Sequence, residues 1–200
     1  VIGNASGRMA EVLTGKEASE AISYPAQMGA EEITLQILEN YDIVILQGDP
    51  YVKMYGREAL GEYVSKGGSL IVVGDAGSKH PEYSNVAGWS WPSGKGIPVP
   101  AQLIGEWVGY SDVARGVDLR LVETKHRIVG GIKLVGTRLE EPSQVFKTVS
   151  KGKTIIAIDT DEGTVPAVIE GAKGSGKVVY FAYDPGQTPN ILLNTLGYLS

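Results

Sequence analysis

The chain has 200 residues, 42% of them hydrophobic and 20% charged, which is typical of one globular domain and argues against a disordered chain. A formal net charge of −5 argues against an extended basic face, so neither nucleic acid nor an anionic membrane is expected as a partner. No cysteine is present, which excludes disulfides, thiolate metal sites and Cys nucleophiles, and no apolar run approaches the roughly 20 residues of a membrane span.

The first half of the chain alternates short helices with apolar runs. The opening letters VIG indicate the end of a truncated strand, and the run Ile43–Leu46 is typical of a strand buried on both faces of a parallel sheet. The expected elements are helix 8–18, strand 21–26, helix 31–40, strand 43–46, helix 52–66 and a strand that starts at 69. Gly67 and Gly68 end the third helix, where a left-handed cap needs glycine. This order predicts a doubly wound α/β sheet, mostly parallel and flanked by helices.

Residues 77–118 interrupt the alternation as an irregular insertion rich in Trp, Pro and Gly. They contain four of the ten prolines and all three tryptophans, Trp89, Trp91 and Trp107. Long irregular stretches inside a compact domain are often functional. Exposed indole rings would bind sugar rings or apolar protein surfaces, so this insertion is a candidate aromatic binding loop. The alternative is that the indoles bury themselves over the edge of the sheet.

The second half predicts strands at 118–123 and 154–159, a C-terminal antiparallel hairpin and a final helix. The hairpin turns at Gly174-Ser175-Gly176, and Thr188 caps a helix with Pro189 in its first turn. Leu192, Leu193, Leu196 and Leu199 form the expected packing stripe of that helix. We expect residues 1–200 to form a single α/β domain that belongs to a longer protein.

Three turns fall at the predicted carboxyl ends of strands, where open α/β sheets bind ligands. They read LQGDP at 46–50, VGDAGS at 73–78 and YDPG at 183–186. With the two histidines they make a candidate binding cleft of Gly48, Asp49, Gly74, Asp75, Asp184, His80 and His126.

Together with YDIVILQG, KHRIVGGI and GKVVYFAYDPG, these turns resemble the class I glutamine amidotransferase-like superfamily, which has a flavodoxin-like fold. The resemblance is closer to its divergent, non-catalytic or ThuA-like members. Active members carry a Gly-x-Cys-x-Gly elbow and a Phe-His-Pro-Glu turn, against which this sequence places Ala76, Asp184 and Gly186 at the Cys, His and Glu positions. The family's Gly-Gly-Pro oxyanion turn is matched by Gly48-Asp49-Pro50. The resemblance therefore implies a lost Cys-His-Glu triad, no Cys-dependent glutaminase activity and no cofactor.

The acidic residues leave two further hypotheses open. Asp75 at the elbow would act as a carboxylate nucleophile with His80 or His126 as its base. Alternatively, Asp49, Asp75 and Asp184 would hold a hard cation such as Mg²⁺ or Ca²⁺. The plainer interpretation is that these aspartates cap turns and helices, and that His126 makes a structural hydrogen bond or starts a helix.

The hypothesis that this sequence favours is a non-enzymatic amidotransferase-like domain that serves ligand binding or protein assembly within a larger protein. Its partners would be other segments of the parent protein, a second protein or a glycan. The alternatives are an Asp-based or metal-dependent hydrolase that uses Asp75 and Asp184, and a structural domain of a cell-surface or membrane-anchored assembly. The sequon Asn4-Ala5-Ser6 gives slight support to an extracytoplasmic location.

Overall fold

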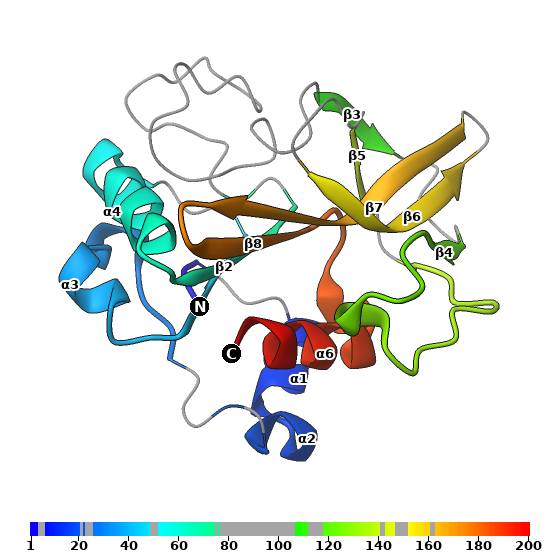
Figure 1. Ribbon diagram of the computed structural model, residues 1–200, viewed down its shortest axis with the longest axis horizontal. Coiled ribbons are helices and arrows are strands. Elements are labelled where there is room, and N and C mark those ends of the chain that lie inside the picture. Colours follow the sequence, from blue (N-terminus) through cyan, green and yellow to red (C-terminus); the bar gives the residue numbers. More distant parts are fainter. Residues whose placement is uncertain are drawn as a thin grey trace.

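A six-stranded mixed sheet with helices on both faces forms the frame of the computed structural model (Figure 1). The structure describes residues 1–3, 7–20, 22, 26–48, 52–74, 76, 107–111, 118–140, 143–146, 152–160 and 163–200. For residues 54, 107–111, 143–146 and 160 it describes the backbone alone.

The described helices and strands follow the predicted alternation. The helices are α1 (Gly7–Thr14), α2 (Lys16–Ser19), α3 (Leu35–Leu38), α4 (Met54–Ser65) and α6 (Pro189–Leu199), with 3-10 turns η1 (Ala30–Glu32), η3 (Arg127–Val129) and η4 (Pro185–Gln187). The strands are β1 (Ile43–Leu46), β2 (Ser69–Val73), β3 (Trp107–Ser111), β4 (Leu119–Leu121), β5 (Ser143–Phe146), β6 (Lys153–Thr160), β7 (Gly163–Lys173) and β8 (Gly176–Phe181).

One half of the large sheet is parallel. β1 pairs with β2, and β2 with β8, all in the same direction. Single parallel bridges continue this half beyond β1, from Leu46 to Ile2 and from Ile2 to Met28. The spatial order Met28, Ile2, β1, β2, β8 is the strand order of a flavodoxin-like doubly wound sheet. The prediction of a doubly wound α/β fold is therefore confirmed.

The other half of the sheet is antiparallel. β8 pairs with β7, β7 with β6, and β6 with β4. The predicted hairpin is confirmed as β7–β8, and it turns at Gly174 with a φ of +61°. A Cβ atom on Gly174 would also lie closer than 3.0 Å to the Ser65 backbone, so both conformation and space require glycine there. β3 and β5 form a separate two-stranded antiparallel sheet.

Three of the predicted elements differ in the structure. The helix expected at 8–18 is divided into α1 and α2, because Gly15 between them has an extended backbone with φ −71° and ψ 161°. The helix expected at 31–40 is divided into η1 and α3, because Thr34 has an extended backbone and its side chain accepts a hydrogen bond from Ile37 N at 3.3 Å, which starts a new helix. Within the strand expected at 21–26 the structure describes Ile22 and Ala26, and neither is in a strand. The parallel bridge falls at Met28 instead.

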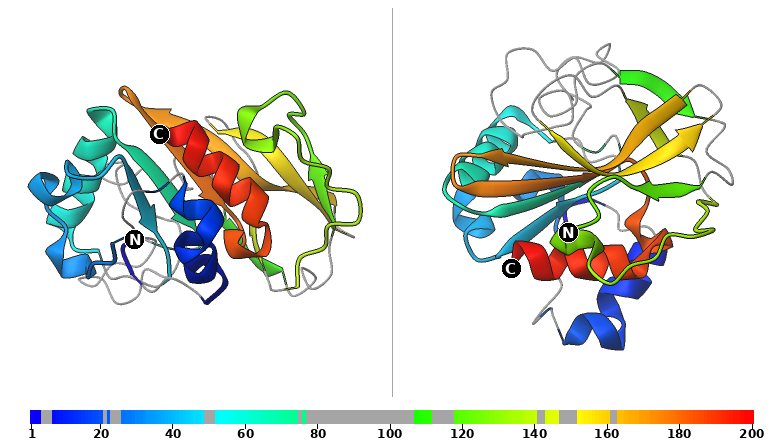
Figure 2. Two further views of the ribbon diagram at one scale, coloured as in Figure 1. Left: turned by 90° about the horizontal axis from the view of Figure 1, so that it is seen from below. Right: turned by 45° about the vertical axis from the view of Figure 1, so that its right-hand side comes forward.

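Each face of the sheet has its own hydrophobic cluster. α1 and α6 cover one face and α3 and α4 cover the other, as the two views of Figure 2 show. All five residues of β2 are buried, because helices lie on both of its faces. In α6, Leu192, Leu196 and Leu199 are buried as predicted, whereas Leu193 is only partly buried and Ile191 takes its place in the core.

Candidate functional site

Three neighbouring parallel strands end at glycines in the left-handed region. Gly3, Gly48 and Gly74 follow Ile2, β1 and β2, with φ values of +93°, +77° and +61°. Nothing in the described structure lies within 4 Å of a Cβ built on Gly74, so its backbone conformation is what calls for glycine. Gly74 N donates to Phe181 O at 2.8 Å, which joins the ends of β2 and β8. The structure therefore brings Gly48, Gly74 and the turn at Asp184 together at the carboxyl ends of the parallel strands.

The residue at the proposed nucleophile position lies in the core. Ala76 is fully buried in the hydrophobic cluster beneath α3 and α4. Its amide donates to Val73 O at 3.1 Å and closes the turn after β2. A methyl group in this position offers no nucleophile and does not face solvent.

Asp184 caps the turn after β8. Its Oδ1 accepts a hydrogen bond from Gly186 N at 2.8 Å, and its backbone carbonyl accepts one from Gln187 N at 3.0 Å. Both bonds belong to η4, in which Pro185 is the first residue. A carboxylate held in this way stabilises the turn, as acidic residues before a helical turn commonly do.

The next position of the turn has no space for a side chain. A Cβ atom on Gly186 would lie closer than 3.0 Å to Met9 N, Arg8 C and Arg8 Cβ, at the start of α1. A glutamate there, as in the Phe-His-Pro-Glu turn, would require α1 to move. The start of α1 therefore leaves no room for a side chain at position 186.

Tyr183 anchors the same turn from inside. It is 2% exposed, and its hydroxyl lies 2.9 Å from Thr188 Oγ1. Burial raises the pKa of Tyr183, an effect that the hydrogen bond with Thr188 partly offsets and the nearby charge of Asp184 increases. The phenol is therefore protonated at neutral pH and acts as a structural hydrogen-bonding group.

Arg57 is a buried charged residue that the sequence interpretation did not identify. It lies in α4, is 1% exposed, and donates from Nε to Val52 O at 2.7 Å. The sequence does contain a signal for this burial. In α4, Arg57 lies one turn before Leu60 and two turns before Val64, and this spacing places the three residues on the buried face of the helix. Tyr55, two residues before Arg57 in the same helix, is 47% exposed. A buried guanidinium beside the segment that follows β1 is costly to desolvate and so belongs among the candidate site residues.

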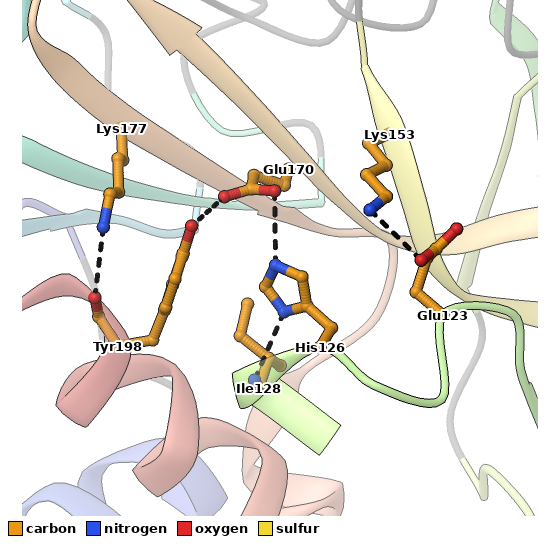
Figure 3. Close-up of polar contacts among 7 residues, drawn as sticks. All are labelled: Glu123, His126, Ile128, Lys153, Glu170, Lys177 and Tyr198. Atoms are coloured by element: carbon orange, nitrogen blue, oxygen red, sulfur yellow. Dashed lines mark hydrogen bonds and ion pairs between the residues drawn. The ribbon is translucent and has the colours of Figure 1, made fainter. Parts of the chain in front are cut away.

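His126 lies elsewhere, in a polar network on the α6 face of the sheet (Figure 3). Its Nδ1 accepts a hydrogen bond from Ile128 N at 3.2 Å, so Nε2 carries the proton and donates to Glu170 Oε2 at 3.2 Å. The hydroxyl of Tyr198 donates to the other oxygen of Glu170. His126 therefore starts η3 and links it to β7, and these contacts do not bring it to Gly48, Gly74 or Asp184.

Tyr198 joins α6 to this network. Burial, followed by the hydrogen bond with Glu170, raises the pKa of Tyr198 to about 12. Lys177 Nζ lies 4.1 Å from the centre of the tyrosine ring, and the His126 and Tyr198 rings pack in a T-shaped arrangement with centroids 4.9 Å apart. The network ties the last helix to β7, β8 and η3.

Several candidate residues lie outside the part of the chain that the structure describes. They are Asp49, Asp75, His80, Trp89 and Trp91, and of Trp107 the structure describes only the backbone, in β3. The three-aspartate cation site and the aromatic loop therefore remain predictions. Among the described residues, no group of three histidine or acidic side chains is placed to hold a metal ion. The helices of that same part of the chain include none with the length and hydropathy of a membrane span.

Comparison with known proteins finds similarity in structure alone. No family model matches the chain, and no curated protein matches it in sequence. Two cytoplasmic proteins from Salmonella typhimurium are 15% and 14% identical, with TM-scores of 0.59 and 0.62. These matches cover 92% of this chain and 85% and 86% of theirs. A protein described as ThuA-like, from Bacteroides uniformis, is 13% identical with a TM-score of 0.62, over 86% of this chain and 75% of its own.

Larger enzymes contain the same fold as one part of their chains. The β-galactosidase from Bacillus circulans sp. alkalophilus is 16% identical with a TM-score of 0.60, over 86% of this chain and 24% of that one. A GH42 β-galactosidase from G. stearothermophilus is 14% identical with a TM-score of 0.59, over 98% of this chain and 27% of its own. At these identities the likeness concerns the fold. The fold is compatible with the class I glutamine amidotransferase-like class, which was the resemblance found in the sequence.

Proposed function

We propose that this chain is a non-enzymatic amidotransferase-like domain that serves ligand binding or protein assembly within a larger protein. The observation that carries this proposal is the turn after β8. Asp184 is engaged with Gly186 N, and Gly186 itself is packed against the start of α1. The two positions that the sequence resemblance aligns with a general base and its orienting carboxylate thus support the turn by their contacts.

The chemistry of acyl transfer supports the same proposal. A covalent mechanism needs a nucleophile with a base within hydrogen-bond reach. Ala76 contributes a buried methyl group, and the whole sequence has no cysteine that would replace a lost thiol. Because triad members act as a unit, loss of all three removes the rate enhancement that depends on them.

The occurrence of this fold as one part of larger proteins supports the proposal that the chain works within a larger protein. In the two β-galactosidases this chain matches about a quarter of the length. The same fold therefore occurs as one domain among others in larger chains. We extend this arrangement to the present chain, whose partners would be other segments of its parent protein, a second protein or a glycan.

Activity and binding assays on the purified chain test the proposal. With glutamine and with chromogenic amides and esters as substrates, we expect release of ammonia or nitrophenol at the rate without protein. Turnover that disappears in Asp75→Ala would contradict the proposal and support the carboxylate hydrolase. Calorimetric titration with the neighbouring segments of the parent protein, and with a glycan panel, should then detect binding to one of them. Absence of both binding and turnover would also count against the proposal.

A further inference from the structure

Both nitrogens of the His126 ring make hydrogen bonds, and the two contacts have opposite requirements. Nδ1 accepts a hydrogen bond from Ile128 N at 3.2 Å, and Nε2 donates to Glu170 Oε2 at 3.2 Å (Figure 3). The first contact needs an unprotonated nitrogen, since a backbone amide can only donate. A second proton on the ring would occupy Nδ1 and face the Ile128 N–H. This arrangement therefore requires a neutral imidazole.

The contact that a second proton would break is the cap of η3. His126 stands directly before Arg127, the first residue of this turn, and has an extended backbone with φ −71° and ψ 142°. Amides at the start of a helical turn lack partners within the turn, and the Ile128 amide finds its acceptor in the His126 ring. Without that acceptor the turn would keep its backbone bonds from Val129 N to His126 O and from Gly130 N to Arg127 O, both at 3.1 Å.

The groups that face the ring decide which of its two contacts would give way. The Glu170 carboxylate, on β7, lies against Nε2 and would attract an imidazolium, because a hydrogen bond between opposite charges is stronger than a neutral one. The Tyr198 ring of α6 packs against the imidazole, and it carries no charge at neutral or acidic pH because its pKa is raised to about 12. A second proton would therefore strengthen the contact with Glu170 and break the contact with Ile128.

Four further charged side chains lie near the ring and do not change this outcome. Arg127 Cζ lies 5.8 Å and Lys177 Nζ 4.1 Å from the centre of the Tyr198 ring, so both cations rest against the tyrosine. Glu123 and Lys153 form an ion pair with each other at 3.1 Å (Figure 3). None of these contacts supplies an acceptor for a proton on Nδ1.

We propose that His126 is a pH-sensitive latch, in which protonation of Nδ1 releases the Ile128 amide and loosens η3 while Nε2 stays bound to Glu170. Release at this point also weakens the attachment of η3 to α6, because Asn194 of α6 donates to Ile128 O and Gly130 O, both at 3.1 Å. Ile128, which is fully buried, would gain exposure. Imidazole groups in proteins commonly change their charge between about pH 5 and 8. This proposal is independent of the proposed function.

Two NMR measurements on the 200-residue chain test the latch between about pH 8 and pH 5. The ¹⁵N shifts of the His126 ring report its protonation, and hydrogen exchange reports the protection of the Ile128 amide. We expect this protection, corrected for the intrinsic pH dependence of exchange, to fall about tenfold as the ring is protonated, because one hydrogen bond is lost. The amides of Ile71 and Val179, in the centre of the sheet, should keep their protection.

Three results would overturn the proposal. An equal fall in protection at Ile71 and Val179 would show that the whole chain unfolds. Full protection of Ile128 beside a protonated ring would show that the cap does not depend on Nδ1. A ring that stays neutral over the whole range would show that His126 does not respond to pH.

His126→Asn is the variant that keeps the cap and cannot titrate, because the side-chain oxygen of asparagine accepts from the backbone at a cap position. The amide of residue 128 should be protected at high pH and should stay protected when the pH is lowered. The matched control is His80→Asn, which removes the other histidine of the sequence and should leave the pH dependence of Ile128 intact. The same fall in His126→Asn, or its loss in His80→Asn, would contradict the latch. If far-UV circular dichroism shows that His126→Asn does not fold, His126→Ser takes its place, since serine is also an uncharged cap residue.

Discussion

Close packing decides which residue types are possible at the turn after β8. Gly186 touches the start of α1, Tyr183 is enclosed in the core, and Asp184 is hydrogen-bonded within the turn. None of these constraints depends on reactivity. The turn is explained by its contacts, which is why we assign it a structural role.

The contact of Gly186 with α1 predicts a large effect of a small change. Gly186→Ala should lower the free energy of unfolding by about 1–3 kcal/mol, because overpacking shifts the backbone of α1. Urea denaturation followed by circular dichroism measures this. Gly197→Ala is the matched control, since a Cβ on Gly197 in α6 meets nothing within 4 Å of the described structure, and it should raise stability by about 0.5–1 kcal/mol. A tolerated Gly186→Glu would contradict the packing argument.

The burial of Ala76 predicts that a thiol introduced at this position is unreactive in the folded protein. Ala76→Cys should react with a thiol reagent such as DTNB only as fast as the protein unfolds, because the side chain is fully buried. Val135→Cys, at a position that is 95% exposed, should react at once and so calibrates the reagent. Rapid labelling at residue 76 in the folded protein would show that the elbow is open.

At the scale of single elements, α6 and η3 are held to the sheet by the Glu170 network as well as by apolar packing. Glu170 accepts hydrogen bonds from His126, which caps η3, and from Tyr198 of α6. Asn194 of α6 adds bonds to Ile128 O and Gly130 O, both at 3.1 Å. The position of the last helix thus depends on polar groups that lie far apart in the sequence.

The raised pKa of Tyr198 predicts a loss of stability at alkaline pH. Its pKa rises from 10.0 to about 12 in the folded chain, so its contribution is complete below pH 10 and is lost as the pH approaches 12. Ionised Tyr198 would also repel the Glu170 carboxylate. Tyr198→Phe should cost about 1 kcal/mol at pH 7 but show a smaller decline between pH 10 and 12, measured by urea denaturation across that range. An unchanged decline would exclude Tyr198 as a cause.

Across the whole molecule, β8 is the strand that joins the parallel and antiparallel halves of the sheet. Val179 of β8 pairs with Ile71 of β2 on one side and with Glu170 of β7 on the other. Its side chain is fully buried in the cluster beneath α1 and α6. The two halves of the sheet should therefore unfold together, because loss of β8 removes the pairing partner of both β2 and β7.

Substitution in β8 tests this cooperativity. Val179→Ala should lower the free energy of unfolding by about 2–4 kcal/mol, with coincident transitions in near-UV and far-UV circular dichroism. Val122→Ala, at a position that is 42% exposed, should change it by less than about 0.5 kcal/mol. Separate transitions for the two signals would indicate that the halves unfold independently.

The local elements were largely predictable because their signals are local. The apolar runs of β1 and β2, glycine at the turn of β7–β8 and proline at the start of α6 each act over a few residues. The broken helix at Thr34 was missed, since its spacing also fits a continuous helix. The burial of Arg57 was missed because arginine is usually exposed. Only the apolar residues near it in α4 indicate that it lies on the buried face of the helix.

By itself, the sequence determined the α/β fold class, the alternation of its elements and the absence of a cysteine nucleophile, because these depend on residue type and period alone. Only the tertiary structure decided that α1 fills the space beside Gly186, that Ala76 points into the core and that His126 bonds to Glu170. Each of these contacts joins residues distant in the chain or depends on which way a turn faces. Three-dimensional packing determines these long-range contacts and the direction of each turn, and no local sequence pattern encodes either of them.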